Sequence, residues 1–259
     1  MKMFLAGVEA GGNNKVMKMF LAGLGSRLDV QNLFKQRIYV LESFYYVKEF
    51  MIPYIEKYWD LLLDSGAFTF MENVKKHVDW DDYILRYADF INQYNIRHFF
   101  ELDIDVVVGI KEVERLREKL ETLTSKKCIP VFHKSRGKDY WAKMIKEYDY
   151  VAIGGIVTKE IKKKEQYIFE WFLDTAKKEN CKVHGLGYTN LTGLKKYHFY
   201  SVDSSSWISG NKFGHVHKFD GETIRKTDKT KTQRIKNKET ATNNFREWVK
   251  FQKYAEEHL

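Results

Sequence analysis

The chain alternates between short apolar runs and amphipathic helical stretches along most of its length. Seven runs have the pattern of buried strands: residues 37–41, 60–63, 98–103, 129–133, 150–153, 182–186 and 199–202. Between them, apolar side chains recur with helical spacing at 79–94, 111–123, 138–148 and 160–178. Strands joined by helices pair in parallel, because a parallel connection needs a long crossover. The alternation therefore predicts an α/β fold with a parallel sheet.

An eighth strand is expected near the N-terminus, where the heptapeptide Met-Lys-Met-Phe-Leu-Ala-Gly at 1–7 recurs at 17–23. One copy should be the first strand. The other is a tandem duplication, an alternative start or a second strand, and the sequence does not choose between them. Eight strand–helix units predict a (β/α)8 TIM barrel, with a doubly wound open sheet as the alternative.

The character of the sequence changes after about residue 210, so we expect a catalytic barrel over 1–210 and a basic extension over 211–259. A small hairpin is predicted from 213–219 and 222–225, around Asp220 and Gly221. Residues 225–238 are rich in lysine and arginine and poor in apolar residues, which predicts an extended basic arm. Residues 243–257 predict a final helix with an apolar surface that packs on the barrel.

The net charge of +9 and the pI near 9.2 favour a polyanionic partner, most simply nucleic acid, over a merely basic soluble protein. Cys128 and Cys181 are far apart, which argues against a cysteine-based zinc site and fits a cytoplasmic location. No apolar run reaches the roughly 20 residues of a membrane span, so no membrane partner is expected. The dinucleotide, Walker A, serine-hydrolase and zincin motifs are all missing from the sequence.

Two aspartates stand where a strand-like run opens into small residues. Asp64 ends Leu-Leu-Leu-Asp-Ser-Gly, and Asp203 ends Tyr-Ser-Val-Asp-Ser-Ser. A carboxylate at the end of a buried strand is costly to keep ionised, so it often serves a site. The simpler alternative is that each aspartate caps the following turn. In a barrel the carboxyl ends of all strands meet at one face, and that face carries the function.

The fourth strand carries the densest group of acids. A period of two places Glu101, Asp103 and Asp105 on one face of an extended strand, and the apolar residues between them on the other. If the apolar face meets the helices, all three acids point into the barrel mouth. A solvated edge strand would give the same alternation. We expect Asp103, and after it Asp105, to serve the site.

Glycines follow the sixth and seventh strands, at Gly154, Gly155, Gly185 and Gly187. Such glycines allow a ligand to approach backbone amides, although they also serve tight turns.

Two histidines, His133 and His184, could be ligands, acid–base groups or packing residues. No third histidine clusters with them, so neither a metal nor another cofactor is expected.

The order of these segments resembles that of the tRNA-guanine transglycosylase superfamily. Asp-Ser-Gly-Ala-Phe at 64–68 is similar to the Asp-Ser-Gly-Gly-Phe of that family. The strand ending in Asp103, the Ile-Gly-Gly turn at 153–155, the Gly-Leu-Gly turn at 185–187 and the strand ending in Asp203 follow in the same order, so the resemblance spans about residues 23–206. It implies a (β/α)8 barrel that exchanges guanine for a 7-deazaguanine base.

One departure bears on the substrate. Bacterial members that act on tRNA carry a cysteine and histidine zinc site after the barrel, whereas this chain has no cysteine after Cys181. It is also short, like the compact phage-type relatives that modify DNA. The resemblance therefore favours DNA over tRNA, with a base such as 7-cyano-7-deazaguanine or queuine, and a host cytoplasm if the gene belongs to a phage.

The resemblance implies a double displacement. Asp203 is the expected nucleophile at C1′, and Asp64 is expected to protonate the departing guanine. Ser65 and Gly66 of the same motif, and His133, are expected to contact the substrate. Asp103 can accept the N1–H and N2–H₂ groups of guanine, while amides near Gly154 and Gly155 hold O6, and Gly185 and Gly187 line the pocket.

Basic residues outside the pocket are expected to hold phosphates. They are Lys134 and Arg136 after the fifth strand, and Arg225, Lys226, Lys229, Lys231, Arg234 and Lys236 of the arm. Two other functions remain open from the residues alone. One is a sugar-phosphate barrel enzyme, which would use the glycines for phosphate, and the other is a non-catalytic barrel that binds nucleic acid.

Overall fold

A computed structural model describes residues 16–24, 37–66, 69, 78–208, 214–228 and 237–259. Eight strands form one sheet of order β4-β3-β2-β1-β8-β7-β6-β5, and the neighbouring pairs are parallel. The strands are β1 (Lys18–Ala22), β2 (Ile38–Ser43), β3 (Trp59–Asp64), β4 (His98–Phe99), β5 (Val131–Phe132), β6 (Tyr150–Ile153), β7 (Lys182–Gly185) and β8 (Ser201–Ser204). All eight expected strands are present, in chain order.

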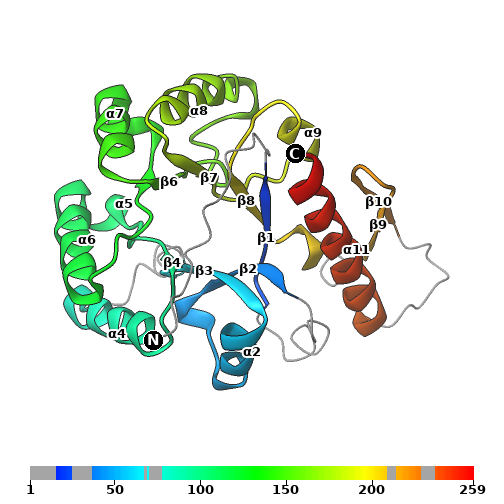
Figure 1. Cartoon of the computed structure of the whole chain (residues 1–259), viewed down its shortest axis with the longest axis horizontal. Helices are drawn as coiled ribbons and strands as arrows, with labels where there is room; N and C mark the ends of the chain where they lie inside the picture. The colour runs from blue at the N-terminus through cyan, green and yellow to red at the C-terminus, as the bar shows by residue number, and fades with distance from the viewer. Residues whose placement is uncertain (1–15, 25–36, 67–68, 70–77, 209–213, 229–236) are drawn as a thin grey trace, which may run out of the picture.

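The sheet closes on itself where its two ends meet. Phe100 and Ile129 form a parallel bridge that joins the end of β4 to the start of β5. The Ile129 amide donates to the Phe99 carbonyl at 2.8 Å, and the Glu101 amide donates to the Ile129 carbonyl at 3.1 Å. Figure 1 shows the helices arranged outside this ring of strands. The (β/α)8 barrel is therefore confirmed over the open sheet.

The second copy of the repeated heptapeptide forms β1, which lies between β2 and β8 at the centre of the sheet order. Its Phe20 pairs in register with Asp203 of β8, so the strand braces one of the two candidate acids. The first copy, at 1–7, lies outside the described residues.

Alternate side chains of the strands separate an inner core from an outer one. Phe20, Leu41, Leu62, Val131 and Ala152 belong to a small apolar cluster inside the ring. Their neighbours in sequence belong to the much larger cluster that packs under the helices. The inner cluster fills part of the barrel, which also encloses the polar side chains of His184 and Ser201.

The main helices of the outer layer are α4 (Trp80–Gln93), α6 (Ile110–Thr124), α7 (Gly137–Glu147) and α8 (Ile168–Lys178), with the shorter α2 (Ile52–Lys57), α5 (Asp105–Val108) and α9 (Leu191–Leu194). Asp79 caps α4 by accepting the Asp82 amide at 3.0 Å. The helix expected from residue 160 begins only at Ile168, because residues before it form turns and the 3-10 helix η4 (Lys163–Glu165). Further 3-10 turns are η1 (Phe44–Tyr46), η2 (Glu49–Met51), η3 (Lys134–Arg136) and η5 (Ser206–Ile208).

The C-terminal helix α11 (Asn237–His258) lies against the outside of β1 and β2 (Figure 1). The Gln252 amide nitrogen donates to the carbonyls of Met19 and Tyr39, each at 2.7 Å. The expected terminal helix is therefore present as part of the outer layer.

A two-stranded antiparallel hairpin, β9 (His215–Phe219) and β10 (Ile224–Asp228), packs on α11. The turn at Asp220 and Gly221 is where the sequence predicted it, although β10 runs further along the chain than expected. Figure 1 shows the hairpin on the side of α11 that faces away from the barrel strands.

Candidate active site

The carboxyl ends of the barrel strands form a mouth lined by acids. Asp64 ends β3, Asp103 follows β4, and Asp203 lies in β8. Burial is the main cause that raises the pKa of Asp64, and the negative charges of Asp103 and Asp203 raise it further, so the three carboxylates influence one another. Strands that are far apart in the sequence thus bring these residues together, as expected at the functional face of such a barrel.

Asp203 is almost buried, and its two donors reach the same oxygen. The Gly187 amide donates to Oδ1 at 2.6 Å, and His184 Nε2 lies 3.2 Å from that oxygen. Gly187 has φ of +67°, a conformation that glycine adopts without strain, and this conformation aims its amide at the carboxylate. The other oxygen of Asp203, Oδ2, accepts no hydrogen bond from the described residues.

Behind Asp203 a polar chain runs down the inside of the barrel. The Tyr150 hydroxyl lies 2.5 Å from the Ser201 hydroxyl, and that hydroxyl lies 2.6 Å from Nδ1 of His184. Burial raises the pKa of Tyr150, which keeps its phenol protonated. We assign Tyr150 as the donor to Ser201, which then donates to Nδ1 and leaves Nε2–H for Asp203. This series of hydrogen bonds fixes the His184 imidazole and orients the Asp203 carboxylate.

Asp64 has little to stabilise its charge. Burial raises its pKa to about 6, against the opposing hydrogen bond that its Oδ2 accepts from the Gly66 amide at 2.9 Å. It forms no ion pair with a described basic side chain. The alternative prediction, that Asp64 caps the following turn, is therefore also correct, because Asp64 accepts the Gly66 amide. Near neutral pH this carboxyl exchanges its proton readily, as a general acid and base must.

A second acid on the same side, Glu42 of β2, is buried beside the mouth. Its Oε2 accepts the Leu24 amide at 2.9 Å, and its Oε1 accepts the Ser43 amide at 3.1 Å. Burial raises the pKa of Glu42 to about 7, and the charge of Asp64 adds to the shift. Glu42 was not predicted from the sequence, although its position near the end of a strand resembles that of Asp64.

On the other side of the mouth, His133 is clamped between two carboxylates. Its Nε2 lies 2.8 Å from Asp103 Oδ1, and its Nδ1 lies 2.9 Å from Glu160 Oε2. Both ring nitrogens therefore donate, which makes the ring an imidazolium. Burial alone would lower the pKa of His133, but the hydrogen bonds to Asp103 and Glu160 raise it to about 9. Asp103 is thereby held in one orientation beside a positive charge.

Asp105 does not extend the strand, and this part of the sequence prediction was wrong. The chain leaves the sheet after Phe100, and Asp105 opens the short helix α5. Its carboxylate accepts the guanidinium of Arg136 at 2.8 Å. The apparent alternation at 101–105 therefore spans a strand end and a turn.

Glu101 does not face the mouth either. It is fully buried and points to the helical layer, where Arg117 of α6 donates to it at 2.6 Å. Its other oxygen accepts the Val131 amide at 2.7 Å. A buried ionised carboxylate needs a charged partner such as Arg117. The sequence alone did not identify Arg117 as that partner.

At Gly154 the missing side chain leaves space for the neighbouring His133 ring. A Cβ at Gly154 would lie 2.9 Å from Cε1 of the His133 ring, so glycine makes room for the clamped imidazole. Gly155 stands against Glu160 in the same way, with its missing Cβ 2.7 Å from Oε2. Gly185 ends β7 and packs beside Phe199. The expectation that these glycines line a substrate pocket stays a prediction.

Ser65 lies next to Asp64, fully buried, and its hydroxyl has no hydrogen-bond partner among the described residues. The carbonyl of Ser65 accepts the Tyr83 hydroxyl at 2.5 Å, which anchors the turn to α4. Ser65 and Gly66 are thus placed at the mouth, where contact with a substrate remains a prediction.

Asp103, Asp105 and His133 present three ligand atoms within 4.8 Å of one another, which invites comparison with a metal site. The positive charge there is already supplied, because Arg136 binds Asp105 and lies 3.8 Å from Asp103. His133 also directs a proton, not a lone pair, at Asp103. This arrangement fits a salt-bridged acid pair better than a cation site.

The basic residues expected to hold phosphates fall into four groups. Lys134 is exposed beside the mouth and pairs with Glu165 at 2.8 Å. Arg136 is buried among Asp105, Asp103 and the Val131 carbonyl, so the structure does not offer it to a phosphate, contrary to expectation.

Arg225 and Lys226 are exposed on β10, on the hairpin outside α11, where Arg225 pairs with Asp220. The other residues of the arm, Lys229, Lys231, Arg234 and Lys236, lie outside the described residues.

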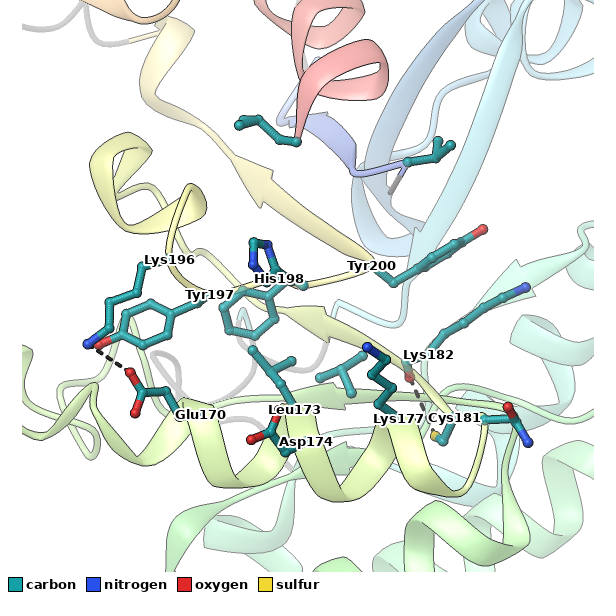
Figure 2. Close-up of a pocket in the computed structure, with 15 residues that line it drawn as sticks. Glu170, Leu173, Asp174, Lys177, Cys181, Lys182, Lys196, Tyr197, His198 and Tyr200 are labelled. Atoms are coloured by element: carbon teal, nitrogen blue, oxygen red, sulfur yellow. Dashed lines mark hydrogen bonds and ion pairs between the residues drawn. The ribbon is translucent and has the colours of Figure 1, made fainter. Parts of the chain in front are cut away.

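A cavity of about 560 Å³ lies at the amino-terminal ends of β7 and β8, at the opposite end of these strands from the acids (Figure 2). It is bordered by α8, the segment before β8 and Leu259, and Lys196 pairs with Glu170 at its rim at 2.8 Å. Cys181 contributes a thiol whose pKa burial raises to about 12, which leaves it unreactive. The cavity brings together none of the candidate acids.

Comparison with protein-family models and with curated proteins gives no match for this chain. Among the described residues, no helix combines the length and apolar character needed to cross a bilayer.

Proposed function

We propose that this protein is a transglycosylase that exchanges guanine for a 7-deazaguanine base in nucleic acid, with DNA as the favoured substrate. The observation that carries the proposal is the pair of unequal acids at one barrel mouth. Asp203 is held by two donors on one oxygen, with the other oxygen open, while Asp64 has a raised pKa of about 6. One acid is thus suited to attack and the other to proton transfer.

In the first displacement, Oδ2 of Asp203 attacks C1′ of the target nucleotide and the C1′–N9 bond breaks. The bonding electrons leave with guanine, and protonated Asp64 gives its proton to the departing imidazole ring. In the second, N9 of the incoming base attacks C1′ and releases Asp203, while Asp64 takes the proton from N9. Two inversions at one carbon retain its configuration, as in retaining glycosidases.

The salt-bridged side of the mouth suits recognition of the base. Guanine offers N1–H and N2–H₂ as neighbouring donors, and the oriented carboxylate of Asp103 can accept both. Adenine lacks this donor pair, so binding it would leave the Asp103 carboxylate without the two hydrogen bonds that guanine donates. The clamp from His133 and Glu160 fixes the carboxylate for this contact before the base arrives.

The test is the incorporation of a labelled base. Mixed-sequence genomic DNA and total tRNA are incubated with the protein and either labelled guanine or labelled 7-cyano-7-deazaguanine. Guanine serves because the exchange is reversible in principle and does not require the correct deazaguanine. We expect incorporation into DNA in preference to tRNA. Absence of incorporation into both nucleic acids contradicts the proposal.

The assignment of Asp203 as the nucleophile is tested by comparing two aspartate-to-asparagine variants. Asp203→Asn should lower exchange by about 10⁴-fold or more, since it removes the nucleophile. The control is Asp60→Asn, because Asp60 lies at the amino-terminal end of β3 and pairs with Arg37 at 3.2 Å, away from the mouth. Wild-type exchange by Asp203→Asn would show that another group attacks the sugar.

A further inference from the structure

Exposed apolar side chains gather around the mouth. Ten large apolar residues among the described ones are exposed, and six of them follow the carboxyl ends of strands. These six are Tyr45 and Tyr46 after β2, Val106 and Val107 after β4, and Val157 and Tyr167 after β6. Isolated exposed apolar residues are ordinary on a protein surface, but a set gathered around one opening indicates an interaction surface.

The two valines of α5 form the most exposed part of this set. Val106 is 76% exposed and Val107 is 49% exposed, on a helix of only four residues. Asp103, the proposed reader of the base, lies just before them in the chain. The pair therefore stands at the rim, next to the position where the target base would be read.

Hydrogen bonds hold the helix α5 that carries the two valines. Arg136 binds Asp105 at the start of α5, and the Val107 amide donates to the Ile104 carbonyl at 2.9 Å. Ile104 itself is fully buried. A small helix that is anchored in this way can press two methyl-bearing side chains into a partner without first becoming ordered, which would otherwise cost entropy.

Positive charge lies on another part of the rim. Lys159, Lys162 and Lys163, together with Asn190, line a depression of about 470 Å³ between the segments that follow β6 and β7. None of these lysines has an ion-pair partner among the described residues. They complement a phosphate backbone, and the apolar set complements the faces of bases.

We propose that Val106 and Val107 wedge into the base stack of double-stranded DNA beside the extruded guanine, while Lys159, Lys162 and Lys163 hold phosphates of the same DNA. The inference rests on the proposed function and adds how the target nucleotide leaves the duplex. A base inside a duplex cannot reach a barrel mouth, and apolar wedges are a recurrent means of opening a base step. The wedge matters only where a stack must be opened.

The experiment compares native genomic DNA with the same DNA after heat denaturation, which keeps every sequence context and removes the paired duplex that the wedge would have to open. With Val106→Ser/Val107→Ser, exchange on native DNA should fall by about tenfold or more, and exchange on denatured DNA should stay within about twofold of wild type. The matched control is Leu85→Ser, an exposed apolar residue of α4 that lies off the rim. It should leave both rates unchanged.

The lysines should behave differently from the valines. Lys162→Ala/Lys163→Ala should weaken binding to native and denatured DNA alike, and should reduce the salt dependence of binding, since phosphates are present in both. If the lysine variant keeps wild-type affinity and salt dependence, the lysines do not hold phosphates. Equal losses by the valine variant on the two forms of DNA would contradict a wedge.

A readout without chemistry separates this inference from the proposed function. Duplex oligonucleotides of mixed sequence carry 2-aminopurine next to guanine, and its fluorescence rises when its neighbour leaves the stack. Wild-type protein should raise the fluorescence and the valine variant should not. Failure to exchange any base, with the fluorescence response intact, overturns the proposed function alone. A missing response to wild-type protein, or an equal response to the variant, overturns the wedge.

Discussion

The two sides of the barrel mouth hold their acids in opposite electrostatic surroundings. Near β4 and β5, Asp103 lies against the His133 imidazolium and Asp105 against the Arg136 guanidinium. Near β2 and β3, Asp64 has no ion-pair partner among the described residues, and the neighbouring Glu42 adds a second raised pKa. The side near β4 and β5 holds carboxylates in ion pairs. The side near β2 and β3 holds carboxyl groups with raised pKa values, which can gain or lose a proton near neutral pH.

We propose that this difference separates recognition of the base from proton transfer. A carboxylate that must accept hydrogen bonds from a base should stay ionised, and a neighbouring cation achieves this. A carboxyl that must donate a proton near neutral pH should be desolvated and left without a cation.

Among the variants that compare the two sides of the mouth, the one without the proton donor should show the largest effect. Asp64→Asn should lower exchange by about 10²- to 10⁴-fold, the usual contribution of a general acid. In the wild type, kcat/KM should fall as pH rises through about 6, because Asp64 then loses the proton that it must donate. The variant should lack that limb in a pH–rate profile. A profile with the same fall in Asp64→Asn would assign the limb to another group.

Glu42 should make the fold less stable as pH rises. Its pKa is about 7 in the folded state and about 4.5 in an unfolded chain, so the folded state favours the protonated form. This contribution is complete below about pH 4 and is lost as pH rises through 7, a change of up to about 3 kcal/mol. Urea unfolding across this range should show the loss in wild type and a smaller loss in Glu42→Gln. Parallel curves would contradict the raised pKa.

Removing the imidazolium should mainly weaken recognition. His133→Asn leaves Asp103 without its charged partner, and we expect KM for the incoming base to rise about tenfold with a smaller change in kcat. Lys134→Ala, which changes an exposed neighbour paired with Glu165, is the control and should leave KM near the wild-type value. A variant that loses kcat while KM stays constant would place His133 in the chemical step instead.

The barrel, and the positions of Asp64 and Asp203 at the ends of two strands, could be predicted from the sequence because both depend on local patterns. Buried parallel strands are continuous apolar runs, and Asp64 and Asp203 interrupt such runs at their ends. The fourth strand misled because alternation at 101–105 continues past the point where the chain leaves the sheet. Nothing local marks that point.

Partners that meet only in the fold were beyond the sequence. Glu160 clamps His133 from within a charged run at 159–165 that has the pattern of a solvated surface. In the sequence, Arg117 resembles the other charged residues of an amphipathic helix. In the structure, its position on α6 brings it into contact with Glu101. Such pairs compensate buried charges across elements, so a reading of one segment at a time does not find them.

The most direct test of the account is the location of the covalent intermediate. The protein is mixed with guanine-containing DNA in the absence of a free base, quenched with acid, digested and analysed by mass spectrometry. The account predicts a nucleotide adduct on the peptide that contains Asp203, present in wild type and missing in Asp203→Asn. An adduct on the peptide of Asp64, or exchange that proceeds with no adduct, would contradict the assignment of attack to one acid and proton transfer to the other.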